Sequence, residues 1–91
     1  MEINDDFFSQ LILNINNVRF NKKLFKAYNV QEVDNFLDAL INMLRNNIEP
    51  NYKIKKIEYM INEKKFNFCF SGYNIKEVDE FLLNLVSMLK I

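Results

Sequence analysis

Hydrophobic residues recur every three or four positions along four segments of the chain, which is the spacing of one face of an α-helix. The isoleucines of the third segment would also suit a strand, whereas the two longer segments carry a seven-residue apolar repeat. Because the chain has only one glycine and one proline, most of it is expected to be helical, and the predicted fold class is all-α. The predicted helices are Asp6–Asn16, Val30–Asn46, Tyr52–Asn62 and Ile75–Lys90.

The chain repeats itself. Residues 28–45 align with residues 73–90, and 10 of the 18 aligned pairs are identical. The chain is therefore two copies of one unit, built as short helix, loop and longer helix. One unit alone would expose a long apolar face, and a second copy covers it. We expect a single domain over 1–91, with repeats at about 5–47 (copy one) and 52–91 (copy two) packed as an internal pseudo-dimer. The faces expected to meet are Val33, Phe36, Leu37, Leu40 and Leu44 against Val78, Phe81, Leu82, Leu85 and Leu89.

The start of each long helix is specified by a short motif. Asn29 is placed to cap the helix, and Glu32 stands at the third helical position, as in a capping box. Tyr28 before the cap and Val33 at the fourth position would form a hydrophobic staple. Copy two repeats the motif with Tyr73, Asn74, Glu77 and Val78. Helix initiation therefore accounts for much of the repeated segment without any binding role.

Composition narrows the function classes. Twelve basic and twelve acidic residues give zero net charge, which argues against a nucleic-acid binder. Histidine is absent and cysteine occurs once, so a zinc site is not expected. No nucleophile–base pair or glycine-rich loop is visible, so we expect no enzyme activity and no cofactor. Asp34 and Asp38 could in principle bind Mg²⁺. The alternative function is a DNA-binding helix-turn-helix regulator, since short helix–turn–helix units occur twice.

A longer motif runs through each copy, roughly Ile-x4-Phe-x3-Phe-x-Gly-Tyr-x3-(Glu/Asp)-Val-Asp-x-Phe-Leu-Asp. Copy two departs from it only at Leu83. Copy one has one extra residue between Phe20 and Phe25, and Ala27 in place of glycine. With this motif, each copy resembles the N-terminal domain of the DivIVA/GpsB family of bacterial division and polar-growth adaptors. Copy two matches with Ile61, Phe66, Phe70, Gly72, Tyr73, Glu77, Val78, Asp79, Phe81 and Leu82.

The resemblance implies a fold and a function. The family's domain is a homodimer in which two short helices and their loops cross over the base of a parallel coiled coil. The implied function is a non-catalytic adaptor of bacterial cell division or polar envelope growth, located in the cytoplasm or peripherally at the inner membrane. Family members continue into a coiled-coil tail that drives higher assembly. Here only 18 residues follow Tyr73, so tail-driven polymerisation is not expected of these residues, and homo-oligomerisation by another route is left open.

The first functional surface that the resemblance implies is the loop tip ahead of the glycine–tyrosine pair. There an aromatic and a basic residue enter a membrane surface in the family. Phe25 and Lys26 match this pattern in copy one, and Phe70 keeps the aromatic position in copy two. An exposed Phe beside Lys would insert weakly into an anionic interface. The competing interpretation is that Phe25, Phe66, Phe68 and Phe70 simply close the core around the crossing helices.

The second implied surface is a groove between the short and the long helix, which in the GpsB branch takes up an arginine from a cell-wall synthase. The groove's tyrosine and two aspartates fall on Tyr28, Asp34 and Asp38. Copy two keeps Tyr73 and Asp79 but has Leu83 at the other aspartate position. Two carboxylates four residues apart can accept the forked donors of a guanidinium. The expected partners are therefore arginine-bearing segments of the division or cell-wall machinery, unless the aspartates are ordinary solvated charges near a helix N-terminus.

Overall fold

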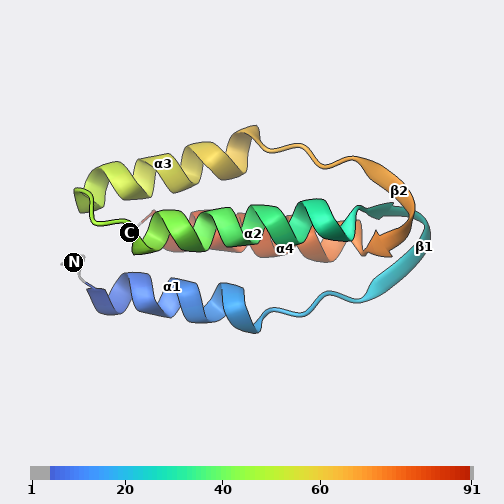
Figure 1. Cartoon of the computed structure of the whole chain (residues 1–91), viewed down its shortest axis with the longest axis horizontal. Coiled ribbons are helices and arrows are strands. Elements are labelled where there is room, and N and C mark those ends of the chain that lie inside the picture. The colour runs from blue at the N-terminus through green and yellow to red at the C-terminus, as the bar shows by residue number, and fades with distance from the viewer. Residues whose placement is uncertain (1–4, 91) are drawn as a thin grey trace.

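The computed structural model describes residues 5–90 and contains four helices and two short strands in that range. Figure 1 shows α1 and α3 flanking the two long helices, with both strands at one end of an elongated molecule. Each predicted helix is present, with its boundaries moved by at most two residues. The elements are α1 (Asp5–Asn17), β1 (Lys22–Tyr28), α2 (Val30–Arg45), α3 (Pro50–Glu63), β2 (Phe68–Tyr73) and α4 (Ile75–Leu89).

The predicted all-α class is wrong, because the loops of the two copies form a two-stranded sheet and make the fold α+β. Neither loop has a neighbour within its own copy that could pair its backbone. Where the two loops cross, each supplies the other's hydrogen-bonding partner, so both become strands. This pairing joins residues about 45 positions apart in the chain. Local hydrophobic periodicity carries no signal for such a contact.

The register shows how the loops cross. Partners along β1 and β2 run in opposite order, as in an antiparallel pair. One additional pairing joins Tyr28 and Tyr73, the last residues of the two strands. Two backbone hydrogen bonds extend the pairing beyond the strands, from Asn74 N to Asn21 O at 2.9 Å and from Asn29 N to Asn67 O at 3.2 Å. Each copy thus holds the end of the other copy's loop. The partners are Lys22 with Tyr73, Lys23 with Gly72, Leu24 with Ser71, Ala27 with Cys69, and Tyr28 with Phe68.

The extra residue of copy one forms a bulge in β1. Between the pairs made by Leu24 and Ala27, β1 has two residues where β2 has only Phe70, which is the arrangement of a β-bulge. Within it, Phe25 has a φ of 78°, a region that a bulky side chain rarely occupies. The insertion is therefore absorbed locally, as backbone strain at the end of the molecule.

The core lies between the long helices and is shared by both copies. In Figure 1 α2 lies in front of α4, and residues of both helices enter one buried cluster together with residues of α1 and α3. Val33, Leu40 and Val78 are completely buried. Of the ten residues expected to form the shared face, nine are buried and Phe81 is half-buried. Burial of these apolar side chains is the main stabilising contribution to the fold.

The predicted helix caps are confirmed, but the predicted capping boxes are not. The side chain of Asn29 accepts a hydrogen bond from Glu32 N at 3.0 Å, and Asn74 does the same for Glu77 N at 3.1 Å. The two glutamates do not return to their own caps. Instead, each accepts two hydrogen bonds from an asparagine of the other copy, as described below. The box fails because crossing of the loops brings a better-placed donor to each carboxylate.

Candidate functional site

Two tyrosine–aspartate hydrogen bonds connect the copies. Tyr73 donates its hydroxyl to Asp34 at 2.8 Å, and Tyr28 donates to Asp79 at 2.8 Å. Each tyrosine ends a crossing strand, so it reaches the long helix of the other copy. The expected grouping of Tyr28 with Asp34 and Asp38 therefore needs correction, because the tyrosine beside Asp34 is Tyr73.

A reciprocal clasp of asparagine–glutamate hydrogen bonds joins the loop of each copy to the long helix of the other. Asn67 donates its backbone N–H and its side-chain amide to Glu32 at 2.9 and 2.8 Å. Asn21 donates in the same way to Glu77 at 2.8 and 3.0 Å. These hydrogen bonds lower the pKa of both carboxyl groups, the backbone donor contributing most. The clasp was not expected from the sequence, although a basic–Phe–Asn triplet, ending at Asn21 and again at Asn67, was its signal.

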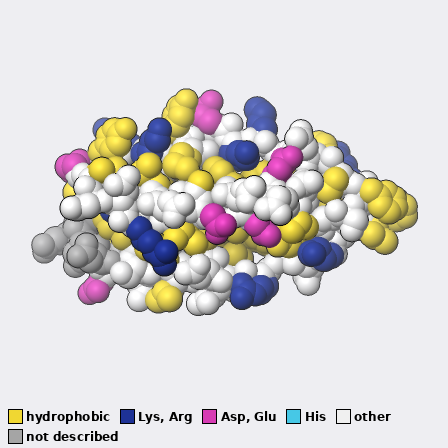
Figure 2. Space-filling model, in the orientation of Figure 1, with side chains coloured by type: hydrophobic (Ala, Val, Ile, Leu, Met, Phe, Trp, Pro, Cys, Tyr) yellow, Lys and Arg dark blue, Asp and Glu magenta, His cyan; other side chains and the backbone are white. Residues whose placement is uncertain are grey.

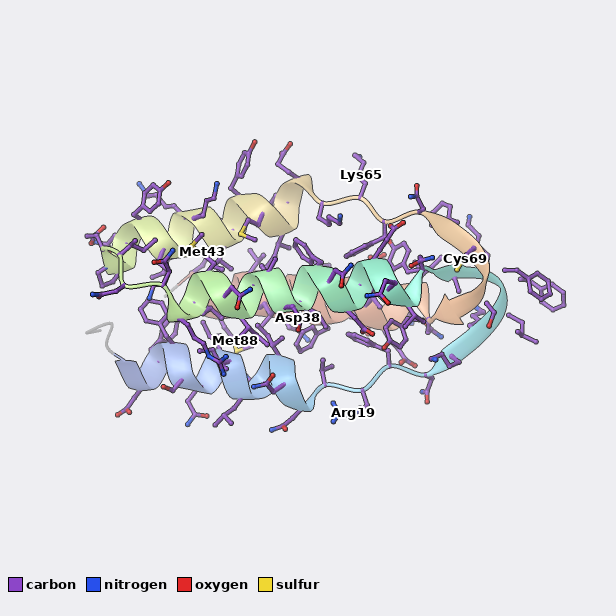
Figure 3. The ribbon with its side chains drawn as sticks, in the orientation of Figure 1. Arg19, Asp38, Met43, Lys65, Cys69 and Met88 are labelled. Atoms are coloured by element: carbon purple, nitrogen blue, oxygen red, sulfur yellow. The ribbon has the colours of Figure 1, made fainter. Side chains whose placement is uncertain are left out.

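Groove one is a hollow of about 530 Å³ between the end of α1, the segment after it, and α2. Its apolar floor is the buried Ile15, Leu37 and Ile41, and the half-buried Val18 and Phe20 line it as well. Figure 3 shows Asp38 on the side of α2 that faces α1, and Arg19 beyond the end of α1. The groove is thus bounded by both copies, since Tyr73 comes from copy two. Its polar lining consists of Asn16, Arg19, Lys22, Asp34, Asp38 and Tyr73.

The two aspartates of groove one differ in whether their carboxylate oxygens already accept a hydrogen bond. One carboxylate oxygen of Asp34 is engaged by Tyr73. Asp38 is exposed and has no hydrogen bond or ion pair with another residue of the range 5–90. Burial, followed by the contact with Asp34, raises the pKa of Tyr73, whereas the charge of Arg19 lowers it. Tyr73 therefore stays neutral and donating at physiological pH, and Asp38 offers the open acceptor.

Groove two occupies the equivalent place in copy two, with a volume of about 320 Å³. Asp79 is present and holds Tyr28, and burial, with that contact, raises the pKa of Tyr28 to about 12. At the position of Asp38 stands Leu83, which is 64% exposed. Lys64 lies over the rings of Phe66 and Phe36, at 5.4 and 5.8 Å from their centroids. Groove two therefore carries one carboxylate and an exposed leucine where groove one carries two carboxylates.

The strand end carries an exposed aromatic cluster, which we call the tip: Leu24, Phe25, Phe68 and Phe70. Phe25 is 79% exposed and Phe70 63%, and their rings meet edge to face at 5.3 Å. Lys26 lies 4.7 Å from the ring centroid of Phe68. Figure 2 shows this hydrophobic group projecting from one end of the molecule. The interpretation that these phenylalanines close the core is wrong for Phe25, Phe68 and Phe70, whereas half-buried Phe66 packs against the core.

A membrane-spanning helix and a cluster of metal ligands are both absent from the described residues 5–90. None of the helices there is long and apolar enough to cross a membrane. No group of three or more potential metal ligands comes together in the same range. A scan against protein-family models found no matching family, and searches of curated proteins and of solved structures found no similar protein.

Proposed function

We propose that this chain is a non-catalytic adaptor of bacterial division or envelope growth that binds an arginine-bearing segment of a partner protein in groove one. The observation that carries the proposal is the open carboxylate of Asp38, four residues from Asp34 on the same face of α2. Tyr73 bounds the site from the other copy. The division and envelope context rests on the repeated motif that resembles the DivIVA/GpsB family.

The chemistry of groove one suits a guanidinium better than an ammonium. A guanidinium presents planar, forked donors that two neighbouring carboxylates can accept together. Asp38 has both oxygens open, and Asp34 keeps one oxygen beyond the bond from Tyr73. The half-buried apolar side chains of Val18 and Phe20 would cover the aliphatic stem of the arginine. Groove two offers a single carboxylate and should bind the same segment less well.

Calorimetric titration with cytoplasmic tail peptides of envelope synthases and division proteins tests the proposal. Asp38→Asn removes the open charge and keeps the shape, so it should weaken binding about tenfold or more, as expected for a hydrogen bond to a charged group. Replacing the peptide's arginine by lysine should also reduce affinity. Asp79→Asn in groove two is the matched control. Equal losses for Asp38→Asn and Asp79→Asn would contradict the proposal, as would tight binding that neither change affects.

A second candidate function is weak contact with an anionic membrane, which the exposed tip supports. Phe25 and Phe70 project together, and Lys22, Lys23 and Lys26 stand on the same strand. Insertion of the aromatic rings and attraction of the lysines to anionic lipids would both contribute to the free energy of membrane binding. Co-sedimentation with vesicles containing anionic lipid should fall with added salt and on Phe25→Glu, while the far-ultraviolet circular dichroism stays unchanged. Lack of sedimentation at low salt would remove this function for the chain.

A further inference from the structure

Groove one contains positive as well as negative charge. Arg19 and Lys22 line it together with Asp34 and Asp38. The guanidinium of Arg19 donates to the carbonyl oxygens of Asn16 and Val18 at 3.0 and 2.8 Å, which places it at the C-terminal end of α1. Arg19 makes no ion pair with either aspartate. Lys22 lies over the ring of Tyr73, 5.4 Å from its centroid. The groove therefore holds two sets of charge that form no ion pair with each other.

A partner arginine entering this groove would be attracted by the aspartates and repelled by the cations. Because Arg19, Lys22 and Asp38 are exposed, water and salt screen both the attraction and the repulsion. A segment with arginine alone leaves Arg19 and Lys22 without a counter-charge. A segment that also carries a carboxylate can pair with both sets, its arginine with the aspartates and its carboxylate with Arg19 and Lys22. Charge complementarity thus favours a dipolar occupant over a purely basic one.

We propose that the segment bound in groove one carries an acidic side chain near its arginine, with the arginine on Asp34 and Asp38 and the acidic side chain on Arg19 and Lys22. The inference rests on the proposed function and names the chemistry of its partner. Groove two carries fewer charges, with Asp79 as its carboxylate and Lys64 as its cation. Lys65, the counterpart of Arg19 in the repeated triplet, does not line groove two.

Synthetic peptides test this inference directly. Each fluorescein-labelled peptide has one arginine in an alanine–serine background, with glutamate placed one to four positions before or after it. In the control peptides glutamine replaces the glutamate. The glutamate should raise affinity about two- to fivefold at its best position, the range expected of partly exposed ion pairs, and the gain should shrink as salt is added.

Arg19→Gln separates recognition from folding. For the arginine–glutamate peptide this change should lower affinity, because the partner of the glutamate is lost. For the arginine–glutamine peptide it should raise affinity, because a like charge is removed. A merely structural role for Arg19 would lower both affinities. Lys65→Gln is the matched control and should change neither, and Lys22→Gln repeats the test should Arg19→Gln reduce the thermal stability.

The outcomes are distinct. Opposite signs of the Arg19→Gln effect for the two peptides support the inference. Binding of arginine peptides that is indifferent to glutamate at every position overturns the inference and leaves the proposed function standing. Failure of all arginine peptides to bind, with or without glutamate, overturns both.

Discussion

The two copies agree where they build the scaffold and differ where they meet solvent. Both long helices begin with the same asparagine cap, and both bury the same apolar face. Their grooves differ at one key position, with Asp38 in groove one and exposed Leu83 in groove two. Their strands differ as well, because β1 has a bulge that β2 lacks. The comparison teaches that the shared core constrains both copies alike, while the two grooves and the tip can take on different chemistry.

The largest expected effect concerns the core. Phe36→Ala should lower the free energy of unfolding by about 3–5 kcal/mol, because Phe36 is buried and packs edge to face on Phe66 at 5.6 Å. Phe81→Ala should cost less, since Phe81 is only half-buried although it contacts Phe20 in the same way. Denaturant unfolding of both variants measures the difference. A larger cost for Phe81→Ala would break the expected order.

The next effect concerns the point where the strands cross. A Cβ on Gly72 would overlap the carbonyl oxygen of Tyr28 and crowd the sulfur of Cys69. Gly72→Ala should therefore destabilise the chain by about 1–3 kcal/mol through overpacking. The counterpart Ala27 is completely buried without such an overlap, so Ala27→Gly should cost only about 0.5–1 kcal/mol. Thermal melting distinguishes the two, and a harmless Gly72→Ala would show that the strands can separate there.

The bulge gives an effect of opposite sign. Asparagine tolerates positive φ better than phenylalanine does. Phe25→Asn should therefore stabilise the chain by about 1 kcal/mol through relief of strain, although it removes the ring contact with Phe70. Phe70→Asn loses the same contact and relieves no strain, so it should destabilise. Equal destabilisation by the two substitutions, measured by chemical unfolding, would show that the backbone at Phe25 stores no strain.

The smallest effect is a dependence on pH. The carboxyl groups of Glu32 and Glu77 have lowered pKa values because Asn67 and Asn21 donate to them. The unfolded chain binds their protons more tightly, so stability from the clasp is present above the ordinary value of 4.5 and is lost as the pH falls through the folded pKa. Glu32→Gln and Glu77→Gln should each flatten the stability profile below that pH. A flattened profile for only one variant would show that the two clasps are not equivalent.

Local pattern predicted the helices and the shared apolar face well, but predicted the strand pairing and the polar contacts between copies poorly. The seven-residue repeat and the asparagine caps were sufficient to place α2 and α4 almost to the residue. The strands were missed because each needs the other copy's loop as its partner. The same crossing exchanged Tyr28 and Tyr73 between the grooves. Asp34 and Asp38 were placed correctly on one face because their spacing of four residues is a property of a single helix.

One measurement tests the central claim that groove one is the arginine site and groove two is not. Calorimetry gives the number of binding sites for a peptide with a single arginine on the wild type, Asp38→Leu and Leu83→Asp chains. We expect one site on the wild type, loss of that site with Asp38→Leu, and a second site with Leu83→Asp, which rebuilds the carboxylate pair beside Asp79. Two equal sites on the wild type, or one unchanged site on all three chains, would contradict the account.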